Sequence, residues 1–253
     1  MARDGVILEI DDVSKRFGAL AALTRVSFAV APGQVFSVIG PNGAGKSTLF
    51  NVIAGLHEPS AGCVRFRGEE ITGLPPEQVN RRGLAKTFQI TNVFPEISVL
   101  DNVRVAAQSR APESGRTASL WRRSNVDGVA LPLLEAFGLA GRRDELAENL
   151  SHGEQRYLEI GLALATAPSL LLLDEPTAGM TPGETREATA LVRKIALERM
   201  LTVLLIEHDM SVVMGISDRV AVLHFGEKIA EGTPEQIRND PRVIDAYLGG
   251  ADD

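Results

Sequence analysis

The nine residues GPNGAGKST, at positions 40–48, restrict the fold of this chain more than any other stretch. They fit the pattern of a glycine, any four residues, a second glycine, a lysine, and a serine or threonine. The apolar run VFSVIG precedes the loop, and behind it apolar residues recur at helical spacing, at Leu49, Val52, Ile53 and Leu56. The predicted order is therefore a buried strand, a glycine-rich loop and a helix. Ordinary amino-acid frequencies produce this pattern in roughly one chain in a hundred of this size, so a glycine-rich turn without a ligand is the weaker interpretation.

The chemistry of this loop suits phosphate groups. Its three glycines let the backbone curl so that N–H groups point inward at phosphate oxygens, and the start of the helix adds a partial positive charge. Lys46 supplies a point charge for the β and γ phosphates, while the hydroxyls of Ser47 and Thr48 are suited to Mg²⁺ and to phosphate, respectively. The predicted nucleotide-binding residues of the loop are Gly40, Pro41, Asn42, Gly43, Ala44, Gly45, Lys46, Ser47 and Thr48.

Two adjacent carboxylates lie at the end of a second apolar run, LLLLDEP. Asp174 and Glu175 should therefore lie at the carboxyl edge of a sheet, where open α/β folds bind ligands. Asp174 is suited to hold Mg²⁺ through water, and Glu175 to orient and deprotonate a water that attacks the γ-phosphate. By the alternation of a strand, the two side chains should point in different directions. Two solvated loop carboxylates are the alternative, which the phosphate-binding loop makes weaker.

The presence of the phosphate-binding loop suggests functional roles for three further side chains. His208 ends a third apolar strand and could reach the γ-phosphate as a donor or an acceptor, although a histidine at a strand end is more often structural. Gln89, in KTFQ, could sense Mg²⁺ and the attacking water. Phe17, in SKRFGAL, is suited to stack on adenine, with core packing as a nearly equal alternative.

The pattern of elements predicts an α/β fold. VILEI and VSFAV alternate apolar residues and predict an antiparallel β portion, whereas fully apolar strands alternating with helices predict a buried parallel sheet. At 253 residues, 44% of them apolar, the chain can form one domain with a small subdomain. We expect a core of residues 1–88 and 168–253 and a helical subdomain at 89–167, in which residues 109–128 are polar and loop-like.

Composition excludes several classes of protein. The net charge is −7 with both signs mixed along most of the chain, so no nucleic-acid partner is expected. Cys63 is the only cysteine, which excludes an internal disulfide and a cysteine-built metal site. The chain has no apolar run of about 18 residues and no signal pattern at its N-terminus, so it is expected to stay in the cytosol. The cluster Trp121-Arg122-Arg123 could touch a partner or lipid head groups, but a solvated helix face is the favoured interpretation.

The stretch ENLSHGEQRYLEI precedes a predicted helix but has no acid, base and nucleophile arranged for a reaction of its own. Ser151, with Glu154 three residues later, fits a capping box, and Thr233 with Gln236 fits another near the C-terminus, where Pro234 starts the helix. Ser151 also offers a hydroxyl, and Gly153 offers open backbone, to a phosphate at the start of a helix. Both roles are compatible.

Taken in order, GPNGAGKST, TFQ, LSHGEQ, LLLLDEP and IEHD resemble the nucleotide-binding subunit of an ATP-binding cassette transporter, from about Val6 to Gly249. The resemblance implies a P-loop ATPase fold that binds ATP and Mg²⁺. It implies that Ser47, Gln89 and Asp174 are metal ligands and that Glu175 is the catalytic base. His208 would be the switch histidine, and Phe17 would contact the adenine.

The same resemblance gives the LSHGEQ signature a partner. In the family, two cassettes enclose two ATP molecules head to tail, so Ser151 and Gly153 would complete the site of a second chain. The chain departs from the commonest family pattern at His152, Glu154 and Thr181, where a glycine, a glutamine and an aspartate are usual. These departures bear on the contacts across the dimer.

A narrower resemblance is carried by TFQITNVFPEISVLDNV, LSHGEQRYLEIGLAL and the C-terminal string from LLIEHD to DAYLG, which are similar to the ATPase subunits of branched-chain amino acid importers. It implies a second cassette, identical or a sister chain, together with integral membrane permease subunits and, indirectly, a periplasmic binding protein. It also implies a place at the cytoplasmic face of the cell membrane, with Phe94 near the groove for a coupling helix. The alternatives are a urea or amide importer, a lipid exporter, a soluble cassette ATPase and a non-catalytic regulator.

Overall fold

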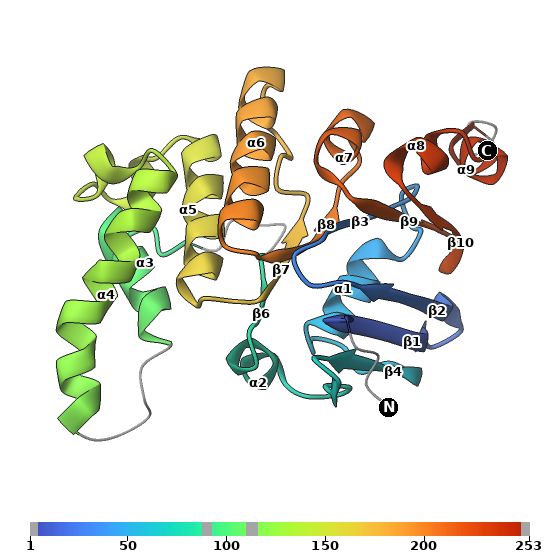
Figure 1. Cartoon of the computed structure of the whole chain (residues 1–253), viewed down its shortest axis with the longest axis horizontal. Helices are drawn as coiled ribbons and strands as arrows, with labels where there is room; N and C mark the ends of the chain where they lie inside the picture. The colour runs from blue at the N-terminus through green and yellow to red at the C-terminus, as the bar shows by residue number, and fades with distance from the viewer. Residues whose placement is uncertain (1–4, 88–92, 110–115, 249–253) are drawn as a thin grey trace.

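The protein contains two β-sheets, of which the antiparallel one lies at the lower right in Figure 1. The computed structural model describes residues 5–87, 93–109 and 116–248, with the backbone alone at 116–125 and 248. The antiparallel sheet contains, in the order β2-β1-β4-β5, β1 (Leu8–Phe17), β2 (Leu20–Val30), β4 (Ala61–Phe66) and β5 (Glu69–Glu70). The larger sheet has the order β10-β9-β3-β8-β7-β6 and contains β3 (Val35–Ile39), β6 (Leu84–Lys86), β7 (Leu170–Asp174), β8 (Thr202–Ile206), β9 (Arg219–His224) and β10 (Glu227–Gly232). Adjacent strands of this larger sheet are parallel from β9 to β6, as the sequence predicted.

Helices cover both faces of the larger sheet. They are α1 (Lys46–Ile53), α2 (Pro76–Arg81), α3 (Val99–Gln108), α4 (Arg116–Ala136), α5 (His152–Ala165), α6 (Pro182–Glu198), α7 (Met210–Ile216), α8 (Pro234–Arg238) and α9 (Pro241–Leu248), with short 3₁₀ turns at Ala140–Arg142 and Ala147–Asn149. The strand β7 shows why its sequence is apolar throughout. Leu170 and Leu172 join the core that α1 forms with the antiparallel sheet, whereas Leu171 and Leu173 join the core under α3 to α6.

The order of the strands positions the functional side chains. The carboxyl ends of β3, β8, β7 and β6 lie next to one another along a single edge of the larger sheet. The phosphate-binding loop follows β3, His208 follows β8, and Glu175 follows β7. Motifs that are far apart in the sequence therefore meet at this edge.

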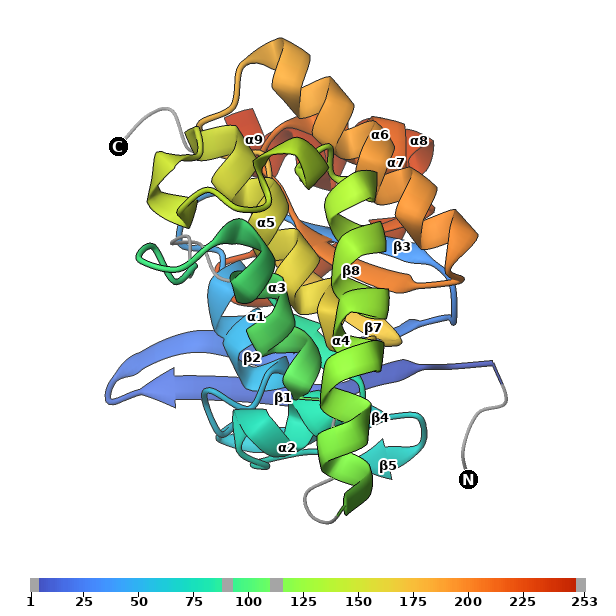
Figure 2. The ribbon, with the colours of Figure 1, turned by 90° about the vertical axis from the view of Figure 1, so that its left-hand side faces the viewer.

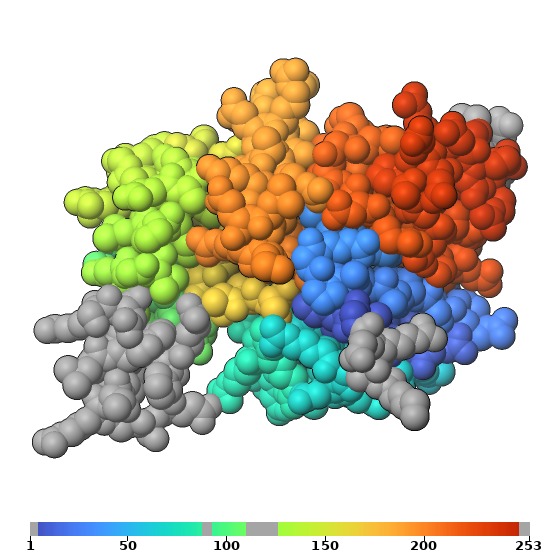
Figure 3. Space-filling model, in the orientation of Figure 1, coloured from blue at the N-terminus to red at the C-terminus, as the bar shows by residue number. Residues whose placement is uncertain are grey.

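The helical segment lies at one end of the molecule. Helices α3, α4 and α5 stand side by side (Figure 2), and the space-filling view shows α6 rising between them and the C-terminal helices (Figure 3). The boundary between the core and a helical subdomain stays a prediction. The expectation of a loop at 109–128 is wrong from Arg116 onward, because α4 begins there. The helix is stabilised by a buried stripe at Val126, Ala130, Leu133 and Leu134. Its other residues can be polar because an amphipathic helix needs only one apolar face.

Three smaller outcomes concern local structure. Leu56 lies beyond α1 and is exposed, because the helix ends at Ile53 and Gly55 turns the chain with a φ of +76°. The predicted capping box at Thr233 and Gln236 is confirmed. Cys63 is a partly buried residue of β4. Over the part of the chain that the structure describes, no helix is long and apolar enough to span a membrane.

Candidate functional site

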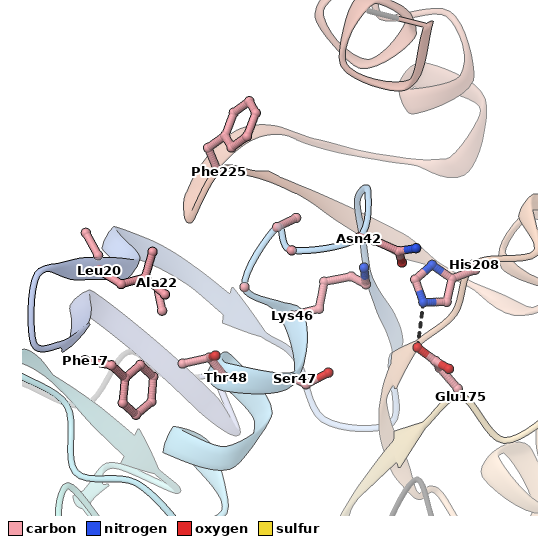
Figure 4. Close-up of a pocket in the computed structure, with 14 residues that line it drawn as sticks. Phe17, Leu20, Ala22, Asn42, Lys46, Ser47, Thr48, Glu175, His208 and Phe225 are labelled. Atoms are coloured by element: carbon pink, nitrogen blue, oxygen red, sulfur yellow. Dashed lines mark hydrogen bonds and ion pairs between the residues drawn. The ribbon is translucent and has the colours of Figure 1, made fainter. Parts of the chain in front are cut away.

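The loop after β3 forms one wall of a pocket of about 510 Å³ (Figure 4). Its described lining residues are Phe17, Leu20, Ala21, Ala22, Asn42, Gly43, Ala44, Gly45, Lys46, Ser47, Thr48, Glu175, His208 and Phe225. Gly45 has a φ of +98°, and a Cβ there would lie 2.5 Å from the carbonyl oxygen of Ala22. Only glycine fits this position without displacing the backbone. The structure thus brings the predicted loop, base and histidine together around one pocket.

Lys46 lies at the base of this pocket. Its ammonium donates hydrogen bonds to the carbonyl oxygens of Gly40, at 2.8 Å, and Pro41, at 3.0 Å. Burial lowers the pKa of Lys46, and the nearby carboxylates of Glu175 and Asp174 act in the opposite direction. Gly40 and Pro41, predicted as binding residues, are not among the described lining residues and serve the site by holding the lysine.

Asp174 ends β7 with a buried carboxylate. Its Oδ2 lies 3.6 Å from the ammonium of Lys86 on the neighbouring strand β6, and its Oδ1 has no hydrogen-bond partner among the described residues. Burial raises the pKa of Asp174, against the lowering effect of Lys86. A buried carboxylate oxygen without a partner is costly, and oxygen donors are the ligands that Mg²⁺ prefers. The donor set of Asp174 and the Ser47 hydroxyl therefore fits Mg²⁺.

The side chains of Glu175 and His208 meet in the pocket. His208 Nε2 lies 2.5 Å from Glu175 Oε1, as the dashed line in Figure 4 marks. Glu175 has a φ of +49°, in the left-handed region, and its N–H donates to the carbonyl of Ile206 on β8. The strand ends at Asp174, so the turn of the backbone, and not the expected strand alternation, separates the directions of the two carboxylates. A carboxylate fixed by an imidazole can accept a proton from a bound water.

A buried glutamate, Glu207, lies beside the pair of Glu175 and His208 and bonds to the backbone of His208. Glu207 accepts hydrogen bonds from the Thr177 hydroxyl at 2.7 Å, the Thr177 N–H at 3.2 Å and the His208 N–H at 3.2 Å. Burial raises the pKa of Glu207 above its ordinary value. The contact joins the loop after β7 to the loop after β8. Sequence reasoning missed Glu207 and Lys86, although a charged residue at the end of a buried strand can signal a buried partner.

The mouth of the pocket is apolar. Phe17 is 43% exposed and is not part of the core. Its ring meets that of His57 edge-on at 5.3 Å, and the Lys15 ammonium lies over the ring at 4.9 Å from its centroid. Leu20 and Phe225 are still more exposed at the same mouth, and the sequence did not predict them. Phe225 reaches the site because the turn between β9 and β10 lies beside the loop, where the Gly226 N–H donates to the carbonyl of Ala44.

Ser151 and Gly153 are not among the described residues that line this pocket. Ser151 caps α5: its Oγ accepts from the Glu154 N–H at 3.3 Å, and the Glu154 carboxylate accepts from the Ser151 N–H at 2.8 Å. The predicted capping box is thus confirmed. Gln89 lies outside the described residues, and its roles toward Mg²⁺ and water stay predictions.

The three departures from the family pattern lie close together. Glu154 forms the capping box of α5 and also binds Arg142 at 2.6 Å. Thr181 caps α6 in a second box with Glu184. His152 approaches Gly179, beside the hydrogen bonds from Thr181 that lower the pKa of Glu184. Each departure therefore serves a local structural contact in this chain.

Comparisons with known proteins agree with the family resemblance of the sequence motifs. The model of the ABC transporter family matches residues 23–178, and that of the branched-chain amino acid ATP-binding cassette transporter matches residues 227–253. The high-affinity branched-chain amino acid transport ATP-binding protein LivG of Escherichia coli is 42% identical over 252 residues, covering 97% of this chain and 98% of that protein.

Solved structures are similar over almost the whole chain. The ADP conformation of an ATP-binding cassette of an ABC transporter has a TM-score of 0.83 at 33% identity, covering 96% of this chain and 99% of the other. A dimeric ATP-binding cassette in a post-hydrolysis state, bound to ADP and phosphate, has a TM-score of 0.77 at 26% identity, covering 90% and 99%.

Proposed function

The chain belongs to the ABC transporter family, and from this premise we propose that it hydrolyses MgATP to drive the import of branched-chain or related amino acids. The observation that carries the enzymatic part is the pair of Glu175 and His208 facing Lys46 across one pocket. The solute assignment is supported by the match to the branched-chain family model at residues 227–253 and by the name of the relative LivG.

In this proposal each side chain has a role. Lys46 exchanges its two loop carbonyls for the β and γ phosphate oxygens of ATP. Ser47, Asp174 and Gln89 would hold Mg²⁺, which when bound neutralises charge on these phosphates. The oxygen of a water attacks the γ-phosphorus, and the bond between the γ-phosphorus and the oxygen that bridges the β and γ phosphates breaks. Glu175 takes the proton of the water, and His208 holds Glu175 in place. The products are ADP and phosphate.

A second cassette completes the site in this proposal. The residues Ser151 and Gly153 lie at the start of α5, where the N–H groups of a helix favour an anion, yet they are not among the described residues of the chain's own pocket. They would contact the γ-phosphate held by a partner, either an identical chain or a sister chain. The dimeric structural relative bound to ADP and phosphate supports this arrangement.

Membrane subunits are the remaining partners. Phe94 is 54% exposed and precedes α3, so it can contact the coupling helix of a permease subunit. A periplasmic binding protein would act on that permease from the other side, and this chain would then lie at the cytoplasmic face of the cell membrane. A urea or amide importer, or a lipid exporter, would use the same catalytic residues and differ in the permease.

The first experiment is light scattering on the Glu175→Gln variant with and without MgATP. The variant should bind ATP, fail to hydrolyse it and change from monomer to dimer, whereas Glu175→Gln/Ser151→Arg should bind ATP and remain monomeric. A Glu175→Gln protein that binds ATP and stays monomeric contradicts pairing of identical chains, and the assay is then repeated with candidate sister cassettes. Uptake of labelled leucine, urea or lipid by vesicles that contain the permease decides the solute.

A further inference from the structure

Arg156 connects the signature helix to the backbone of the catalytic loop. It lies on the second turn of α5, and its side chain is only 4% exposed. Its Nη2 donates to the carbonyl oxygen of Asp174 at 2.7 Å and to that of Glu175 at 2.8 Å, and its Nε donates to that of Pro176 at 3.4 Å. One guanidinium therefore binds three consecutive carbonyls around the predicted base.

These carbonyls belong to a strained turn. A non-glycine residue in the left-handed region costs about 1 to 2 kcal/mol, and Glu175 adopts it with a φ of +49°. The planar, rigid fork of an arginine suits several acceptors at once, which the point charge of a lysine does not. Because the turn directs the Glu175 carboxylate toward His208, bonds that hold the turn also hold the carboxylate.

The charge of Arg156 is balanced on its own helix. Glu159, one turn later, accepts a bond from Arg156 Nη1 at 2.5 Å, and both side chains are buried. Neither residue lines the pocket among the described residues, so the pair does not contact the nucleotide there. It acts on the site through the backbone of the turn.

We propose that Arg156 is a positioning residue that makes the catalytic turn of Glu175 follow the signature helix. This inference rests on the proposed function, in which Ser151 and Gly153, at the start of the same helix, contact the ATP held by the partner. Through Arg156, closure of the signature on one nucleotide sets the base at the other, which couples the two sites of the dimer.

The test replaces the arginine without leaving an unpaired charge. Arg156→Met alone removes the ion-pair partner that Arg156 provides to the buried Glu159 and can fail to fold, so Arg156→Met/Glu159→Met is the informative variant. Arg193→Met is the matched control, because Arg193 also binds a carboxylate, that of Asp218, and a backbone carbonyl, that of Ile216, but does not touch the catalytic turn. Each protein is compared by melting temperature, by kcat and KM for MgATP, and by MgATP-dependent dimerisation in the Glu175→Gln background.

The double variant should lose about tenfold to a hundredfold in kcat, as expected when a catalytic group is misplaced, while KM changes less than about threefold and dimerisation is retained. Arg156→Lys should recover only part of kcat, and Arg193→Met should match the wild type. A folded double variant with unchanged kcat overturns the proposal, as does one whose activity falls because it no longer dimerises. If the wild type itself neither binds nor hydrolyses MgATP, the proposed function fails instead.

Discussion

Replacing Ser151 by alanine separates its local role from its proposed role in a dimer. Its Oγ caps α5 at 3.3 Å from the Glu154 N–H, and the opposite half of the box closes at 2.8 Å. Thr233 caps α8 with almost the same geometry, at 3.3 Å and 2.9 Å, and does not line the pocket. Thr233→Ala therefore loses a matched cap without losing any predicted contact with phosphate.

The magnitudes follow from these contacts. Loss of a cap costs about 0.5 to 2 kcal/mol, and because Glu154 and Gln236 keep their half of each box, we expect about 0.5 to 1 kcal/mol for either variant. The melting temperature should fall by about 1 to 4 °C in both. Only Ser151→Ala also loses a hydrogen bond to a charged phosphate, about 1.5 to 3 kcal/mol at each shared site. That loss weakens MgATP-dependent dimerisation by at least about tenfold.

The assay is the dimer dissociation constant of both variants in the Glu175→Gln background at saturating MgATP, beside a thermal melt. Equal melting temperatures with a tenfold difference in dimerisation would support the shared site. Equal dimerisation of the two variants would refute it and leave Ser151 as a helix cap alone.

Three further outcomes are expected. Gly45→Ala should destabilise the protein by more than Gly43→Ala in thermal melts without nucleotide. A Cβ at Gly45 meets the Ala22 carbonyl at 2.5 Å, whereas one at Gly43 meets nothing within 4 Å. Equal losses of stability would show that they come from backbone strain alone. Burial raises the pKa of Glu207, so the folded state holds this proton more tightly than the unfolded chain, and the stability from this effect is lost as the pH rises from the ordinary pKa of a glutamate through the raised one. The melting temperature of Glu207→Gln relative to the wild type should therefore increase as the pH rises through this range, and the opposite trend would contradict the burial argument. Phe17→Ala should weaken ATP binding by about 1 to 3 kcal/mol in titration calorimetry if adenine stacks there, and an unchanged affinity would remove Phe17 from the site.

The sequence predicted the parts of the site that depend on local patterns. The loop at 40–48, the capping boxes and the carboxylates after an apolar strand each follow from neighbouring residues. The contact of Lys86 with Asp174 depends on β6 lying next to β7, which the strand pattern leaves open. Similarly, the contacts of Arg156 and Phe225 depend on how α5 and the β9–β10 turn return to the sheet. The left-handed backbone of Glu175 occurs where Arg156 binds the carbonyls of residues 174–176, and it has no sequence signal of its own.

The order of the strands also has a consequence for how the protein is made. On the ribosome, β3 and its loop emerge early, yet both neighbours of β3 in the sheet, β8 and β9, are synthesised near the end of the chain. Long-range pairing of this kind is slow and leaves apolar strands uncovered in the meantime. The nascent chain therefore leaves β3 unpaired until β8 and β9 have been synthesised, and nucleotide can stabilise the loop after β3 fully only once these strands have joined the sheet.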